Sequence, residues 1–222
     1  LAHITSSGLV IKLSTWRCLD GMNEKGVSIA VLTLDSDPTY QQTGKPMIAT
    51  TLAIRLVLDR AATTAEAVEL LSKYDMFASS GRDYHFYITD ASGDGRVLEY
   101  DCNDPARPLT ATPSRSVTNF FVMYKDNVLP NQRNGVYGHG RERYDAIEEI
   151  LDANAGSIDR EIAWQALQAA SQAPNPQDVT SNTQWSILYD NTALTAEAVI
   201  RRDWNTKTSY DLVSNVALTD VG

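Results

Sequence analysis

The stretch that most constrains the fold of this chain is residues 20–35, which reads DGMNEKG followed at once by VSIAVLTLD. A polar run that ends in Gly26 is typical of a tight turn, because glycine adopts a positive φ without steric cost. Branched residues then alternate with smaller ones over residues 27–32, which is the period of a β-strand. We therefore expect residues 16–22 and 27–35 to form a hairpin within a sheet that is covered on both faces.

The remaining periodicities predict helices in pairs between hairpins. Apolar residues at a 3.6-residue spacing predict helices over residues 46–61, 63–73, 141–153 and 159–172, with Gly156 as a C-cap. Thr63 with Glu66 three residues later is a capping-box pattern at the start of the second of these helices. Strands are expected at residues 84–91 and 96–101, at residues 183–189 and 194–201, and, as a short piece, at residues 116–121. This order predicts a layered α+β structure and a single domain over residues 1–222. Two long loops, residues 35–45 and 125–140, are candidates for functional segments.

Composition excludes several classes of partner. The net charge of −9 argues against nucleic acid and anionic membranes, which are themselves polyanions. No apolar run approaches the roughly 18–20 residues that cross a bilayer, and the first residues show no signal peptide, so a cytoplasmic location is expected. The sequence holds no P-loop, no GxGxxG and no cysteine–histidine spacing of a metal site, so we expect neither cofactor nor metal.

The usual catalytic motifs are missing as well. There is no GxSxG and no HExxH, and His3, His85 and His139 are far apart in the sequence. His85 lies within a predicted strand and is expected to be a packed core residue, whereas His139 stands between two glycines and is also expected to be structural. Cys18 and Cys102 are expected to be buried, reduced thiols. A Ser–His–Asp or Cys–His triad cannot be argued from these residues.

Five segments that follow one another in a fixed order resemble the choloylglycine hydrolase family of linear amide C–N hydrolases, which includes bile salt hydrolases and penicillin V acylases. They are residues 20–26, residues 84–93 with 97–100, residues 117–120, residues 141–144 and residues 183–189. The resemblance implies an N-terminal nucleophile hydrolase with an αββα four-layer sandwich. In this family a cysteine at the first position attacks the amide carbonyl and its own α-amino group is the base, which explains the lack of a histidine triad.

The resemblance also implies roles for individual residues. Asn119 matches the family's asparagine that donates to the oxyanion or to the amino terminus of the nucleophile; alternatively it only ends a strand. Arg143 matches the arginine at the start of a helix that orders the site, with Arg141 as its rival and a solvated surface arginine as the alternative. Thr33 falls where bile salt hydrolases carry an oxyanion asparagine and penicillin V acylases a tyrosine, so it is a candidate substrate-binding residue or simply a strand residue.

The front of the chain departs from the family pattern. The nucleophilic cysteine is expected several dozen residues before the hairpin, and neither Cys18 nor Cys102 is terminal. We therefore expect an N-terminally incomplete amide hydrolase that lacks its first strands. The substrate would be a small N-acyl amide, of the bile-salt or penicillin V kind; the alternatives are an acyltransferase on the same scaffold and a non-catalytic binding remnant. Because missing strands expose sheet edges, association as a homo-oligomer or with the absent segment is expected.

Overall fold

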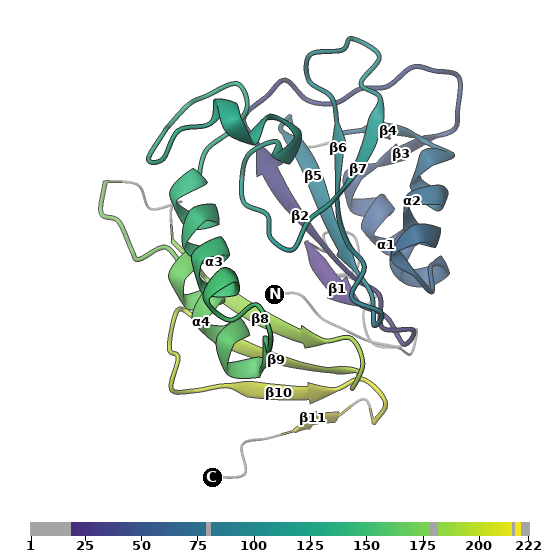
Figure 1. Ribbon diagram of the computed structural model, residues 1–222. Helices are drawn as coiled ribbons and strands as arrows, with labels where there is room; N and C mark the ends of the chain where they lie inside the picture. The colour runs from purple at the N-terminus through teal and green to yellow at the C-terminus, as the bar shows by residue number, and fades with distance from the viewer. Residues whose placement is uncertain (1–18, 79–80, 178–181, 215, 219–222) are drawn as a thin grey trace.

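The computed structural model describes residues 19–78, 81–177, 182–214 and 216–218, and in this part of the chain two sheets lie between two pairs of helices (Figure 1). The first sheet has the order β1-β2-β5-β6-β7 and the second the order β11-β10-β9-β8, with antiparallel neighbours throughout. The strands of the first sheet are β1 (Asp20–Met22), β2 (Ser28–Leu34), β5 (Asp83–Thr89), β6 (Gly95–Tyr100) and β7 (Leu109–Pro113). Those of the second are β8 (Trp185–Asp190), β9 (Thr195–Ile200), β10 (Thr208–Asp211) and β11 (Val216–Leu218). The helices are α1 (Thr50–Arg60), α2 (Thr64–Ser72), α3 (Arg141–Ala153) and α4 (Arg160–Ala170). This arrangement confirms the αββα sandwich.

The hairpin predicted at residues 16–22 and 27–35 forms over its described part. β1 and β2 pair with Met22 opposite Ser28, and residues 16–18 lie outside the described part. Gly26 closes the turn with a φ of 75°, and a Cβ there would stand 2.2 Å from the Asn191 carbonyl oxygen of the β8–β9 turn. Only glycine fits this position without moving one hairpin away from the other.

The turn contains a polar residue that is buried, Asn23, and all of its side-chain hydrogen bonds in the described ranges are to backbone groups. Its side-chain oxygen accepts the N–H groups of Lys25 and Val27, both at 3.0 Å. Its amide nitrogen donates to the carbonyls of Leu58 and Ala61 at the end of α1, at 3.1 and 2.8 Å. These are carbonyls that a helix end leaves without an intrahelical partner. The asparagine of the family-like segment therefore joins the first hairpin to α1.

The main core lies between the first sheet and the pair α1 and α2. One face of each central strand of the first sheet supplies it with residues that are at most 1% exposed: Ile29, Phe86, Ile88, Leu98 and Tyr100, together with Val27 just before β2. Because side chains alternate along a strand, His85 and Glu99 lie on the opposite face of the same sheet. His85 is 0% exposed, which confirms that it is a packed, buried residue.

The helix predictions are confirmed for most of their length. Thr63 caps α2 by accepting the N–H of Glu66, as the capping-box pattern predicts. α3 has the predicted bounds, and Asp159 caps α4 by accepting the N–H of Ile162. The predicted C-cap Gly156 is wrong: α3 ends at Ala153 and its C-cap is Asn154, whose side chain donates to the helix carbonyl of Ile150.

The prediction of one helix over residues 46–61 is wrong at its start. Residues Met47–Ala49 form the strand β3, which pairs in parallel with β4 (Asp75–Phe77). Ile48 and Met76 are opposite each other in this pair and are both buried. The partner strand lies more than 25 residues further along the chain, so the local apolar period did not reveal the pairing.

The predicted strand at residues 116–121 is also wrong. The edge of the first sheet is taken by β7, and residues 116–121 leave the sheet, with a single bridge between Phe120 and Gly138. Phe120 instead packs in a second cluster with Val97, Val122 and Val128. Strands β10 and β11 were likewise not predicted. No helix in the described ranges has the length and apolarity that a membrane crossing needs.

Candidate active site

The structure brings the three predicted site residues into one hydrogen-bonded chain. The side-chain nitrogen of Asn119 donates to the backbone carbonyl of Thr33 at 3.0 Å, and Arg143 Nη2 donates to the side-chain oxygen of Asn119 at 3.0 Å. Thr33 comes from β2, Asn119 from the segment after β7 and Arg143 from the first turn of α3. Three segments far apart in the sequence thus meet at the Asn119 side chain.

This arrangement fixes the orientation of the Asn119 carboxamide. Its oxygen faces a donor that cannot accept, the guanidinium, and its NH₂ group faces a carbonyl that cannot donate. An amide nitrogen carries two N–H groups, and the bond to Thr33 uses one of them. Asn119 is partly exposed, and the described ranges show no protein acceptor for the other N–H.

Arg143 carries a positive charge into a partly buried position. Burial holds the pKa of its guanidinium below the usual value, although the neighbouring Glu142 carboxylate opposes this shift. Its Nε is buried without a hydrogen-bond partner in the described ranges, which also show no ion pair between Arg143 and a carboxylate. Arginine stays protonated even so, and the result is an oriented cation that has no direct ion-pair partner in the described ranges.

Arg141, the rival for this position, points elsewhere. Its Nε forms an ion pair with Asp145 at 2.7 Å, and its Nη1 donates to the carbonyl of Lys125. These partners occupy its guanidinium on the far side of the helix start. The geometry favours Arg143 over Arg141 as the residue that reaches Asn119.

Two glycines, which the sequence analysis did not place in the site, allow the close approach. Gly138 and Gly140 have φ angles of 105° and 89°. A Cβ at Gly138 would lie 2.2 Å from the Asn119 carbonyl oxygen, and one at Gly140 would lie 2.2 Å from Arg143 Nη2. Thr118 adds a bond from its hydroxyl to the Gly140 carbonyl at 2.9 Å. The Gly-His-Gly sequence at residues 138–140 was the signal that could have identified this contact.

His139, between these glycines, joins the site to the other long loop. Its backbone N–H donates to the Asn119 carbonyl at 2.9 Å, and its Nδ1 lies 2.7 Å from the carboxylate of Asp35. The two side chains are each 29% exposed. These contacts agree with the prediction that His139 is structural. Its backbone hydrogen bond supports the main chain at Asn119.

Cys102 does not have the properties of an activated nucleophile. It is a free thiol in the turn after β6 and is only partly buried, so the prediction of a buried thiol is wrong for it, while Cys18 lies outside the described ranges. Burial raises its pKa, against the opposing charge of Arg107. A raised pKa lowers the thiolate fraction at neutral pH. The described ranges contain no group of three histidine, cysteine or acidic side chains that could hold a metal ion.

Comparison with known proteins gives one family and a set of similar structures. Residues 3–104 match the model of the linear amide C–N hydrolases, choloylglycine hydrolase family. Structures of two variants of conjugated bile acid hydrolase from Clostridium perfringens superpose with a TM-score of 0.70 at 16% and 17% identity, over 90% of this chain and 74% of theirs. Penicillin V acylase from Agrobacterium tumefaciens superposes with a TM-score of 0.63 at 18% identity, over 89% of this chain and 72% of its own.

No curated protein matches the chain. At the identities given, the similar structures establish the fold alone. The family match over residues 3–104, together with a shared fold over 90% of the chain, confirms the resemblance of this protein to the choloylglycine hydrolase family of linear amide C–N hydrolases.

Proposed function

We propose that this protein hydrolyses the amide C–N bond of small N-acyl amides, with the Asn119 side chain as the oxyanion donor. The observation that carries the proposal is the hydrogen-bonded chain from Thr33 through Asn119 to the partly buried guanidinium of Arg143. Amide hydrolysis passes through a tetrahedral oxyanion, which is stabilised by donors that are fixed before the reaction begins. A carboxamide held at both ends meets this requirement.

Each of the three residues has a distinct part in the proposed reaction. Asn119 donates its second N–H to the oxyanion. Arg143 keeps the carboxamide oriented, and its positive charge favours the developing negative charge in a partly buried site, where charges interact more strongly than in water. Thr33 sets the distance between Asn119 and β2 through its backbone carbonyl rather than through its hydroxyl.

The proposed nucleophile is a cysteine at the first position of a mature chain, as the family resemblance implies. Its α-amino group, with an ordinary pKa of about 7.7–8.0, would accept the thiol proton near neutral pH. The cysteines of the printed sequence are at positions 18 and 102, neither of which is a first position, so in this proposal the nucleophile would come from a segment outside the 222 residues. The raised pKa of Cys102 also argues against that residue as the nucleophile.

The substrate class is proposed from the names of the similar structures. Those proteins are named for conjugated bile acids and for penicillin V, and both compounds are amides that join an apolar or aromatic acyl group to a polar amine. A glycine-conjugated bile acid and penicillin V are therefore the first probes.

The test begins with the protein from its native source. Intact mass and N-terminal sequencing should show a cysteine at the start of the mature chain or of a tightly bound partner. The same preparation should release free amine from at least one of the two probes. A native chain that begins at Leu1, has no such partner and turns over neither probe would disprove the proposal, and transfer of the acyl group to an added amine would replace hydrolase with acyltransferase.

A variant pair then tests the site. Asn119→Ala should lower kcat by about 10²–10³-fold, the usual cost of a lost oxyanion donor. Asn205→Ala is the matched control, because Asn205 is exposed between β9 and β10 and should leave kcat unchanged. Equal activity of the two variants would contradict the assignment of Asn119.

A further inference from the structure

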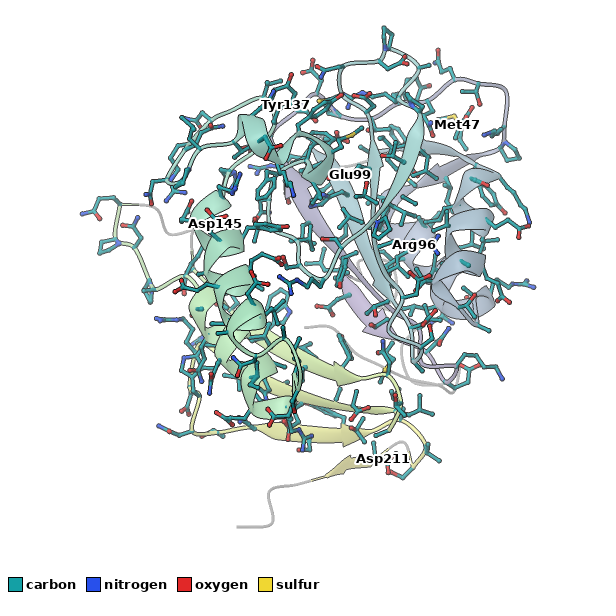
Figure 2. The ribbon with its side chains drawn as sticks, viewed as in Figure 1. Met47, Arg96, Glu99, Tyr137, Asp145 and Asp211 are labelled. Atoms are coloured by element: carbon teal, nitrogen blue, oxygen red, sulfur yellow. The ribbon has the colours of Figure 1, made fainter. Side chains whose placement is uncertain are left out.

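A buried glutamate–histidine pair on the first sheet has no part in the proposed reaction. Glu99 on β6 and His85 on β5 are both 0% exposed, and His85 Nδ1 lies 3.0 Å from Glu99 Oε1. Figure 2 shows Glu99 on the first sheet beneath the short 3₁₀ helix η2 (Val122–Asn127). The N–H groups of Val122 and Met123 donate to the two oxygens of Glu99 at 2.6 and 3.0 Å.

The hydrogen-bond partners of this pair leave one polar atom without a partner. Glu99 accepts hydrogen bonds from two peptide N–H groups, and His85 Nδ1 is the third nitrogen within hydrogen-bond distance of its carboxyl oxygens. His85 Nε2 then remains buried without a partner in the described ranges. In these ranges Glu99 also forms no ion pair with lysine or arginine. Burial of a carboxyl group and of an unpartnered ring nitrogen costs free energy that a pair of apolar side chains would not. The presence of Glu99 and His85 at this place therefore requires a further explanation.

The segment that Glu99 holds is the one that carries Asn119. Val122 and Met123 follow Asn119 by three and four residues. Phe121 lies between Asn119 and Val122, and its N–H donates to the Tyr137 carbonyl. The loop at residues 137–139 therefore holds the part of the segment near Asn119. The other end of the segment, at Val122 and Met123, is held by the Glu99 side chain. Glu99 belongs to β6, which is paired with a strand on each side.

We propose that Glu99, oriented by His85, is a positioning residue for Asn119 and fixes the place of its carboxamide through the Val122 and Met123 peptide groups. This inference rests on the proposed function, because Asn119 is the oxyanion donor there. Small displacements matter in such a site: a shift of about 1 Å can cost on the order of 10²-fold in rate. Glu99 never touches the substrate in this account.

The test compares Glu99→Gln with a matched control, Glu197→Gln. Glutamine has the same shape but presents one acceptor oxygen and one NH₂ group to three N–H donors, so one peptide group is repelled. We expect kcat to fall about 10–100-fold with KM changed less than about twofold. Glu197 is the other buried glutamate of the described strands; it pairs with Trp164 and Arg160 of α4, so its variant should lose stability but keep kcat.

A second readout does not depend on activity. In NMR spectra of the labelled chain, the side-chain amide resonances of Asn119 should shift in Glu99→Gln and stay in place in Glu197→Gln. A wild-type protein without amidase activity would disprove the proposed function, while these resonances would still decide the positioning role. Unchanged Asn119 resonances and unchanged kcat in a folded Glu99→Gln variant would disprove the role of Glu99.

A histidine pair covers the case in which Glu99→Gln does not fold. His85→Asn keeps a side-chain N–H near the place of Nδ1, whereas His85→Phe removes it. The first variant should retain kcat and the Asn119 resonances, and the second should change both. Equal behaviour of the two variants would disprove the orienting role of His85.

Discussion

The two long loops of this protein are held in opposite ways. The first loop, residues 35–45, is fixed by buried side chains that reach it from other elements, Asp83 and Asp75. The second loop, predicted over residues 125–140, begins at residue 128 because residues 125–127 belong to η2. It is anchored at its two ends, where Val128 is buried in the second apolar cluster and Gly138, His139 and Gly140 contact the segment of Asn119. Both loops meet at the pair of Asp35 and His139.

The contacts of the first loop are buried and numerous. Asp83, 1% exposed, accepts the N–H and hydroxyl of Thr39 at 3.1 and 2.7 Å and the hydroxyl of Ser36 at 2.6 Å. Its second oxygen is 3.2 Å from the guanidinium of Arg107, which is also buried. Gln41 adds a bond from its amide to the Arg107 carbonyl at 2.6 Å. This loop is part of the scaffold.

The tip of the second loop has contacts of another kind. Gln132 bonds back to Leu129 and Gly138 of the same loop, and Arg133 reaches Glu142 at 3.4 Å as an exposed ion pair. Such exposed pairs contribute about 0–1 kcal/mol. Leu129 and Val136 are 67% and 61% exposed. The end of this loop therefore supports the site, while the contacts of its tip are exposed or partly exposed, unlike the buried contacts of the first loop.

The largest effect should come from removing the anchor of the first loop. Asp83→Ala leaves the Arg107 guanidinium buried without its carboxylate, so we expect a loss of about 3–5 kcal/mol in the free energy of unfolding, measured with urea. Asp37→Ala is the control, since Asp37 is an exposed acid of the same loop, and it should change stability by less than about 0.5 kcal/mol. Similar losses in both variants would show that the loop does not depend on Asp83.

A smaller effect should distinguish one glycine of each loop. Gly138 and Gly44 both have positive φ angles, 105° and 93°, but a Cβ at Gly44 meets nothing within 4 Å. Gly44→Ala should therefore cost only the backbone strain, about 1–2 kcal/mol. Gly138→Ala adds a collision with the backbone of Asn119 and Phe120, and should cost about 3 kcal/mol or more. Equal urea midpoints of the two variants would contradict the close packing of the second loop on Asn119.

The smallest expected effect on stability comes from the Asp75 carboxylate, which binds the first loop, and its dependence on pH should be confined to acid pH. A hydrogen bond from the Thr43 hydroxyl, with backbone N–H groups of Thr43, Lys45 and Gly44, holds the pKa of Asp75 below its usual value, against the effect of burial. Because the folded pKa is the lower one, this stabilisation is present above the unfolded pKa of about 3.9 and is lost as pH falls through the folded value.

The measurement is the urea midpoint as a function of pH. The wild type should have a higher urea midpoint than Asp75→Asn, by a difference that is constant above about pH 5 and shrinks below about pH 4. Thr43→Val, which removes only the hydroxyl bond, should show a weaker dependence on pH than the wild type. A difference in urea midpoint that stays unchanged at low pH would contradict the role of the Asp75 charge.

The candidate site was predicted in its residues but not in its geometry. Asn119 and Arg143 were identified because the segments around them resemble a family, and the structure shows them in contact. That Thr33 takes part through its carbonyl could not be predicted, because sequence says nothing about which backbone group a distant side chain reaches. Glu99 escaped notice for the same reason: its partners are peptide groups more than 20 residues further along the chain.

The sequence by itself determined what depends on neighbours along the chain: the hairpin at Gly26, the capped helix after Thr63 and the span of α3. Turns and helices of this kind are set by local φ preferences and by apolar period. Only the tertiary structure decided where residues 47–49 and 116–121 went, because strand formation depends on a partner that is distant in sequence. It also decided that the Asn119 carboxamide is locked, since Thr33 and Arg143 reach it from separate layers of the sandwich.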